Sequence, residues 1–289
     1  MEVEFTRFDI ADGPDPYGVV VADDAAVWVT LVHSGAVARL TGDGRCTRHP
    51  VDAVSRPSVL AAGHGGAAWF TRTGDDRVTS VTADGVMTTV ELGSGSGPFG
   101  ICAGPDDAMW VTESTADRVA RIDADGSVGS VAMPAGSFPS FITAGPDGAL
   151  WVTLNRADAV ARITTAGEVT VHGLPTSGAA PVGIAAGGGA LWCAEIGAGQ
   201  LVRIEPDCTT TEFSLPDTTA RPHAVAAGAY GCWFTEWAVN RVGHIGWSGE
   251  IEEFDLPASA SEPHGVAVGP DGQVWVAMES GALVRLSCR

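Results

Sequence analysis

Apolar and polar residues alternate in short runs along the whole chain, and the runs are separated by turns rich in glycine and aspartate. Runs such as RVARI at 118–122 and AVARI at 159–163 have the two-residue period of β-strands with one buried face. No stretch shows the longer period of an amphipathic helix. The pattern therefore predicts an all-β protein of short strands joined by hairpin turns.

A tryptophan stands at the same point of each repeat of this pattern. Successive tryptophans are 41 residues apart five times and 42 residues apart once, at Trp28, Trp69, Trp110, Trp151, Trp192, Trp233 and Trp275. Each repeat has a Pro-X-Gly-like triplet that opens a strand, then the tryptophan strand, then two further strands. Seven units of about 40 residues, each with four antiparallel strands, predict a seven-bladed β-propeller.

The two ends of the chain predict how the ring of blades closes. The last repeat stops after its third strand, ALVRLS at 282–287. Near the N terminus, EVEFTRF at 2–8 matches the fourth-strand pattern EIEEFDL at 250–256. The N-terminal strand should therefore complete the last blade, which removes two exposed strand edges. We expect residues 1–289 to form a single propeller domain.

Composition and charge narrow the classes of function. The formal net charge is −19, from 35 acidic and 16 basic residues, which argues against binding to nucleic acid. No apolar run approaches the length of about 18 residues that a membrane span requires, and the first residues, MEVEFTRFDI, lack the features of a signal peptide. No two of the 6 cysteines are spaced as a CxxC motif, and we expect all of them to be reduced. We expect a cytoplasmic protein with no nucleic-acid or membrane partner.

The residue X of the Pro-X-Gly-like triplet varies while the frame around it repeats. Around the ring it is Tyr17, Ser58, Phe99, Ser140, Val182, His223 and His264. Because the triplet opens the innermost strand of each blade, these side chains should surround one mouth of the central channel. Variation at one repeated position is expected where a symmetric scaffold carries a binding or catalytic site.

Carboxylates and a second histidine gather around this position in the last two repeats. Glu262 comes two residues before His264, and antiparallel pairing should return Glu279 to the same level. His223 occupies the matching position in the neighbouring repeat. Carboxylate oxygens suit Mg²⁺ completed by water and substrate, and an imidazole can move a proton. The alternative is that each group is an ordinary polar residue at a channel mouth.

Two further sets of residues complete the survey of candidate chemistry. The last residue of the tryptophan strand also varies, and it is acidic at Glu113, Glu195 and Glu236; in the last repeat the position corresponds to Met278 and Glu279. This variation marks it as a second candidate site position. The remaining histidines stand outside both positions, and we expect them on the surface or in loops: His33, His49, His64, His172 and His244.

With these residues in hand, the chain resembles the virginiamycin B lyase family, also called streptogramin B lyases, over all seven repeats. Five segments carry the resemblance: GPDPYGVVV (13–21), SFPSFITAGPDGALWVT (137–153), ARPHAVAAG (220–228), WFTEWAVNRVGHI (233–245) and SEPHGVAVGPDGQVWVAMES (261–280). The resemblance implies a monomeric seven-bladed propeller that uses Mg²⁺. It implies that the enzyme linearises cyclic streptogramin B depsipeptide antibiotics by β-elimination at the threonyl ester, and so confers antibiotic resistance.

The resemblance also implies roles for individual residues. His264 matches the general base of the family, and Glu262 and Glu279 match its Mg²⁺ ligands. His223 matches a substrate contact. We further expect Tyr17 and Trp237 to form walls that contact an aromatic-rich substrate.

Two other functions are compatible with a propeller, because this fold hosts many activities. The first is a metal-dependent lactone hydrolase, which would add water and would spread its carboxylate and asparagine ligands over several blades. The second is a binding module without chemistry, which would tolerate replacement of the histidines and glutamates. The concentration of these residues in the last two repeats favours the lyase.

Overall fold

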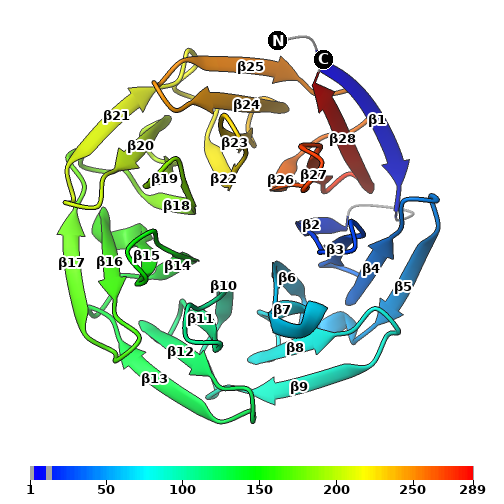
Figure 1. Ribbon diagram of the computed structural model, residues 1–289, viewed down its shortest axis with the longest axis horizontal. Coiled ribbons are helices and arrows are strands. Elements are labelled where there is room, and N and C mark those ends of the chain that lie inside the picture. Colours follow the sequence, from blue (N-terminus) through cyan, green and yellow to red (C-terminus); the bar gives the residue numbers. More distant parts are fainter. Residues whose placement is uncertain (1–2, 11–14, 289) are drawn as a thin grey trace.

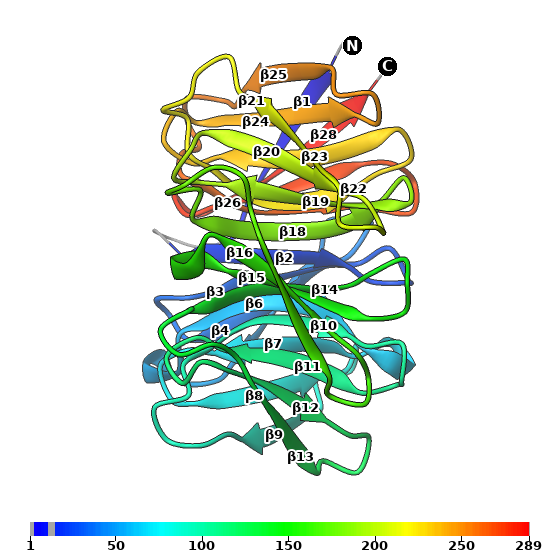
Figure 2. The same ribbon diagram turned by 90° about the vertical axis from the view of Figure 1, so that its left-hand side faces the viewer.

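The computed structural model describes residues 3–10 and 15–288, which form seven four-stranded antiparallel sheets arranged as a ring (Figure 1). The inner strands run along the axis of the ring, and the outer strands are tilted by the twist of each sheet (Figure 2). The described residues contain three short 3-10 turns: η1 (Ala53–Ser55), η2 (His64–Gly66) and η3 (Asn155–Ala157). No helix in this part of the chain is long and apolar enough to cross a membrane. The predicted seven-bladed β-propeller is confirmed.

In the first four blades the strands follow one another along the chain from the innermost to the outermost. Blade 1 contains β2 (Pro16–Val21), β3 (Val27–Leu31), β4 (Ala36–Leu40) and β5 (Cys46–Pro50). Blade 2 contains β6 (Pro57–Ala62), β7 (Ala68–Arg72), β8 (Arg77–Val81) and β9 (Met87–Glu91). Blade 3 contains β10 (Pro98–Ala103), β11 (Met109–Glu113), β12 (Arg118–Ile122) and β13 (Val128–Ala132). Blade 4 contains β14 (Pro139–Ala144), β15 (Leu150–Leu154), β16 (Ala159–Ile163) and β17 (Val169–Gly173).

The remaining three blades follow the same order. Blade 5 contains β18 (Pro181–Gly187), β19 (Ala190–Glu195), β20 (Gln200–Ile204) and β21 (Thr210–Ser214). Blade 6 contains β22 (Pro222–Ala227), β23 (Gly231–Glu236), β24 (Arg241–Gly246) and β25 (Ile251–Asp255). Blade 7 contains β26 (Pro263–Val268), β27 (Val274–Met278), β28 (Ala282–Cys288) and, as its outermost strand, β1 (Val3–Asp9).

The N-terminal strand closes the ring in the predicted way. β1 pairs antiparallel with β28 over its whole length, from Val3 opposite Cys288 to Asp9 opposite Ala282. The first and last strands of the chain therefore lie side by side at the rim of blade 7 (Figure 1). This pairing joins the first and last segments of the sequence and satisfies the backbone groups of both strands.

The hydrophobic core lies between neighbouring blades, which explains the spacing of the tryptophans. Trp28 of β3 is 1% exposed and shares a cluster with Leu60 and Phe70 of the next blade. Trp151 of β15 likewise packs with Ile184 of the following blade. Each tryptophan fills the wedge between two sheets, so replacing a buried one with alanine should lower the free energy of unfolding by about 3–5 kcal/mol.

A β-bulge at position X turns the start of each inner strand toward the channel. In every described blade the pairing of the two inner strands shifts between the proline before X and the residue two after X. The residue two before X has a left-handed φ between 45° and 60° in six blades, including Glu262 at 60°. Bulges re-aim side chains and disrupt local pairing. The scaffold therefore presents the X residues at one end of the channel.

Candidate active site

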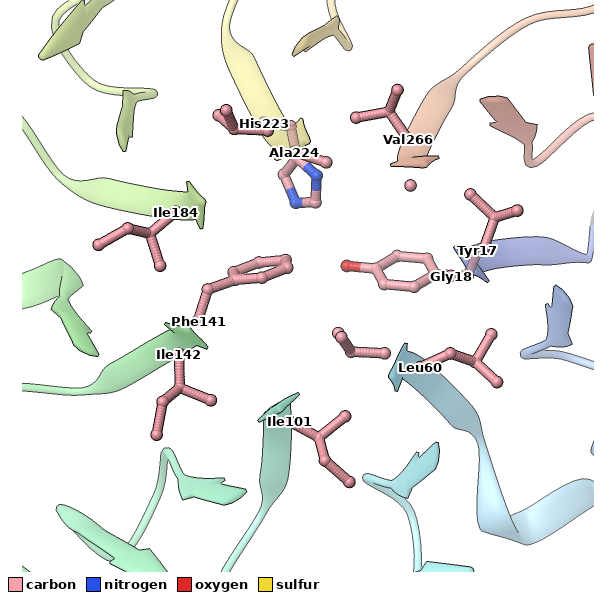
Figure 3. A pocket seen from close by; sticks show the side chains of 14 residues that line it. Tyr17, Gly18, Leu60, Ile101, Phe141, Ile142, Ile184, His223, Ala224 and Val266 are labelled. Atoms are coloured by element: carbon pink, nitrogen blue, oxygen red, sulfur yellow. The ribbon is translucent and has the colours of Figure 1, made fainter. Parts of the chain in front are cut away.

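Three of the predicted site residues meet at the centre of the propeller. Tyr17, His223 and His264 come from the bulges that open β2, β22 and β26. The rings of Tyr17 and His264 are stacked, with centroids 4.6 Å apart. The two imidazoles meet edge to face at 5.5 Å, and His223 lies 6.3 Å from Tyr17. Figure 3 shows Tyr17 and His223 pointing into the channel.

The two predicted carboxylates lie beside this ring cluster. Glu279 follows the last residue of β27, and its Oε2 is 2.5 Å from Nε2 of His264. Its backbone N–H donates to the carbonyl of Glu262 at 3.0 Å, so the two residues belong to one corner of the mouth. The side chain of Glu262 is exposed and makes no hydrogen bond or ion pair with another described residue. The prediction that antiparallel pairing returns Glu279 to the level of Glu262 is confirmed.

His33 lies in an exposed turn, as expected, and this turn borders the same corner of the mouth. Nε2 of His33 is 2.8 Å from Oε1 of Glu279, so this carboxylate contacts two imidazoles. Asp15 holds the loop in place, because its Oδ1 accepts from the backbone N–H groups of His33 and Ser34 at 2.8 and 3.0 Å. Asp15 occupies the position of Glu262 in the first repeat, which is the one signal that could have pointed to this loop.

Three other histidines are partly buried, where we expected surface or loop positions. They lie on strands and their rings contact the tryptophans of their own blades. The pairs are His49 with Trp28 at 5.5 Å, His172 with Trp151 at 5.8 Å, and His244 with Trp233 at 4.9 Å. These histidines pack against the core tryptophans of their blades and contact none of the site residues described above.

Burial sets the protonation of the ring cluster. Burial lowers the pKa of His223 to about 4, and His264 beside it adds to the effect. Burial also lowers the pKa of His264, although Glu279 and Glu262 oppose it. Burial raises the pKa of the Tyr17 phenol, and the charge of Glu279 raises it further. At neutral pH both imidazoles of the channel and the phenol are therefore uncharged.

Glu279 remains a carboxylate and fixes the tautomer of His264. Burial alone would raise the pKa of Glu279, but hydrogen bonds from His33 and His264 outweigh it and the pKa is lowered. An ionised carboxylate only accepts hydrogen bonds, so Nε2 of His264 carries the proton. Nδ1 of His264 then holds the lone pair, and this buried atom has no partner among the described residues. The ring is a neutral base oriented by a carboxylate.

Aromatic side chains extend the mouth on both sides of the histidines. Trp237 is 37% exposed and lies 6.4 Å from the ring of His264, consistent with the wall position predicted for it. On the other side, Phe99 lies 6.4 Å from Tyr17, and Phe141 lies 5.9 Å from His223. The sequence did not indicate Phe141, because it follows the X residue of its blade and only the bulge turns it inward.

Beyond these rings the channel is narrow and apolar. The residue two after X forms a belt around it: Val19, Leu60, Ile101, Ile142, Ile184, Val225 and Val266. The belt, together with Tyr17, Phe141 and His223, lines a cavity of about 150 Å³ (Figure 3). A cavity of this size holds about one benzene molecule. A large ligand must therefore lie across the mouth rather than enter the channel.

The acidic residues at the ends of the tryptophan strands do not join this site. They face the neighbouring strands of their own blades, where Glu113 pairs with Arg118 at 2.8 Å and Glu195 accepts from Gln200 at 2.5 Å. Glu236 is fully buried and neither of its carboxylate oxygens has a partner among the described residues. These three acids lie apart from the mouth, whereas Glu279, which follows the corresponding residue Met278 in blade 7, contacts His264 there.

These buried acids make stability depend on pH. Burial raises the pKa of Glu195 from 4.5 to about 7, so between these values the folded protein holds a proton that the unfolded chain has lost. The free energy of unfolding should therefore fall as pH rises from 4.5 to 7, by up to about 3 kcal/mol for this group. Urea unfolding of Glu195→Gln between pH 4.5 and 8 should show a shallower fall than the wild type. Glu113→Gln, which removes an ion-paired carboxylate, should keep the wild-type slope; equal slopes in all three proteins would contradict the assignment.

The carboxylates at the mouth fit Mg²⁺ in donor type. Mg²⁺ prefers oxygen ligands and usually keeps several waters beside one or two carboxylates and substrate groups. Glu262 has free oxygens, and each oxygen of Glu279 has lone pairs beyond the one that accepts from an imidazole. Among the described residues no group of three or more His, Cys, Asp or Glu is arranged to hold a metal. The oxygen donors of Glu262 and Glu279 suit an ion whose coordination is completed by water and substrate.

The chain is similar in sequence and fold to known proteins. A model of the virginiamycin B lyase family matches residues 3–286. Virginiamycin B lyase of Staphylococcus aureus is 35% identical, with a TM-score of 0.95 and coverage of 100% of both chains. A catalytically inactive variant of the Staphylococcus aureus enzyme, solved with quinupristin, is 34% identical with the same TM-score of 0.95 and the same coverage of 100%. A 55-residue segment is 60% identical to virginiamycin B lyase of Mycolicibacterium vanbaalenii and spans 19% of this chain and 19% of that protein.

Proposed function

Because this chain belongs to the virginiamycin B lyase family, we propose that it linearises cyclic streptogramin B depsipeptides by β-elimination and so confers resistance to them. The chain is homologous over its full length to virginiamycin B lyase, a carbon–oxygen lyase. One observation carries the proposal: the neutral imidazole of His264, held by Glu279 at 2.5 Å, stands beside Glu262 in an aromatic mouth. The quinupristin complex of the Staphylococcus aureus relative supports a streptogramin as the ligand.

The proposed reaction removes a proton and expels a carboxylate. In the antibiotic ring an ester joins a carboxyl group to the side-chain oxygen of a threonine. His264 takes the proton from the threonine α-carbon, and Nδ1 is the atom with the free lone pair. The electron pair left on the α-carbon forms a double bond to the β-carbon as the bond from the β-carbon to oxygen breaks. The carboxylate leaves with the electron pair of the broken carbon–oxygen bond, so no water or nucleophile is consumed.

The surrounding residues orient and protect this step. Glu279 holds His264 in one tautomer and stabilises the imidazolium that proton transfer creates. His223 is neutral and can donate or accept a hydrogen bond to the peptide ring. Tyr17 and Trp237 offer aromatic faces on either side of His264. Because Nδ1 of His264 is buried, the imidazole must turn or a neighbour must shift when substrate binds.

A bound cation completes the proposed chemistry. Glu262 and Glu279 are the residues that would hold Mg²⁺, since their carboxylates occupy one corner of the mouth. When bound there, Mg²⁺ supplies a Lewis acid that stabilises negative charge on the substrate carbonyl. Two carboxylates balance the charge of the ion, so His264 can remain neutral beside it.

Mass spectrometry of a streptogramin B incubated with the protein tests this function. We expect a linear product of unchanged mass in the presence of Mg²⁺ and no product in the presence of EDTA. A linear product heavier by one water would instead identify a lactone hydrolase. No product under either condition would identify a binding module or a lyase of another ring.

A further inference from the structure

Threonine hydroxyl groups join the inner strands of neighbouring blades. The threonine two residues after the tryptophan faces the bulge, where its Oγ1 accepts from the backbone N–H of the residue after X. In four blades the same hydroxyl donates to the backbone carbonyl of X in the next blade, whereas Thr153 of blade 4 donates to the carbonyl of Phe141 in its own blade at 3.4 Å. These threonine bridges run from Thr30 to Ser58 at 2.6 Å, Thr71 to Phe99 at 2.7 Å, Thr112 to Ser140 at 2.6 Å and Thr235 to His264 at 2.8 Å.

Thr235 makes the bridge that joins the two histidine bulges. Its Oγ1 accepts from the N–H of Ala224, the residue after His223, at 3.0 Å. It donates to the carbonyl of His264 at 2.8 Å. The side chain of Thr235 is fully buried, so these bonds are made without competition from solvent. One hydroxyl therefore ties the main chain of His223 to that of His264, whose rings are 5.5 Å apart.

The propeller itself does not require a bridge at every blade. Ala194 and Ala277 stand at the threonine position in blades 5 and 7, where the next X residues are His223 and Tyr17. Both blades nevertheless contain the bulge and all their strands. Among Tyr17, His223 and His264, only the carbonyl of His264 receives a threonine hydroxyl. The bridge thus fixes one catalytic position more firmly than its two neighbours.

We propose that Thr235 is a positioning residue whose hydroxyl sets the placement of the His264 imidazole relative to His223 and Tyr17. Loss of the hydroxyl leaves a buried N–H and a buried carbonyl unpaired, and the bulge relaxes. The His264 ring then leaves its stack on Tyr17, and proton transfer slows because the ring is displaced from the substrate. The effect on turnover rests on the proposed function, whereas the effect on ring placement does not.

Three variants separate positioning from simple destabilisation. Thr235→Val removes the bridge, Thr235→Ser keeps a hydroxyl, and Thr112→Val removes a matched bridge between blades 3 and 4. We expect Thr235→Val to lower kcat about tenfold with little change in KM, the size of one lost buried hydrogen bond. Thr235→Ser should restore most of kcat. Thr112→Val should lower the Tm by about as much as Thr235→Val does, but it should leave kcat close to the wild-type value.

Proton NMR gives a readout that does not depend on turnover. Stacking on Tyr17 should shift the ring protons of His264 upfield in the free protein. This shift should be lost in Thr235→Val and kept in Thr235→Ser and Thr112→Val. If Thr235→Val keeps the shift, or loses no more kcat than Thr112→Val, the bridge is merely structural and the proposal fails. If the wild type does not linearise streptogramin B, the proposed function fails and the NMR comparison alone decides the placement.

Discussion

Replacing His264 with alanine should lower kcat for streptogramin B linearisation by roughly 10²- to 10⁴-fold, the usual contribution of a general base. The imidazole is the base in the proposed reaction, since burial lowers its pKa and Glu279 fixes its tautomer. KM should change much less, because Tyr17 and Trp237 still offer their aromatic faces to the ligand. Initial rates measured by liquid chromatography and mass spectrometry with saturating Mg²⁺ would give both constants.

His244→Ala provides the matched control. This histidine also contacts an aromatic ring, that of Trp233 with centroids 4.9 Å apart, but it stands on β24. The His244→Ala variant should be less stable, because the contact with Trp233 is lost, and should keep the wild-type kcat. If His264→Ala retained more than about a tenth of the wild-type kcat, a contribution below that of a general base, another group would have to take the proton.

The architecture was predictable because one physical requirement repeats in every blade. Each wedge between two sheets needs a large apolar side chain, and a tryptophan every 41 or 42 residues meets it. The alternation of apolar and polar residues predicted four strands in each repeat. The similarity of residues 2–8 to residues 250–256 predicted that the N-terminal strand closes the ring, as β1 does by pairing with β28. These signals are local in sequence or periodic, so they can be recognised without coordinates.

The site was predictable in its residue types and only partly in its contacts. His223, His264 and Tyr17 share one repeated position, so their meeting at the axis follows from the symmetry of the fold. The role of Phe141 depends on a bulge, which moves a side chain to the other face of the strand and leaves no mark in the alternation. His33 reaches Glu279 across the closure between blade 1 and blade 7, a contact between residues 246 apart in the chain. No local pattern encodes such a contact.

The two carboxylates should respond differently to excess metal, and this is the second large effect that we expect. Glu262 is exposed and unpaired among the described residues, so its only proposed task is to hold Mg²⁺. Glu279 also orients His264 at 2.5 Å. Both Glu262→Gln and Glu279→Gln should weaken Mg²⁺ binding by at least about tenfold, the loss seen when even an outer partner of a metal ligand is removed. Raising the Mg²⁺ concentration should then restore kcat in Glu262→Gln but not in Glu279→Gln.

The reason for this difference is the neutral amide that replaces Glu279. An amide can accept a hydrogen bond from Nε2 of His264, but it carries no charge to stabilise an imidazolium, so proton transfer stays slow however much metal is bound. Titration calorimetry with Mg²⁺ would measure the affinity independently of turnover, and kcat at saturation would measure the second role. Glu113→Gln, which removes a carboxylate paired with Arg118 outside the mouth, should change neither quantity. If high Mg²⁺ fully restored kcat in Glu279→Gln, Glu279 would act only as a metal ligand. The proposal that its charge assists His264 would then be wrong.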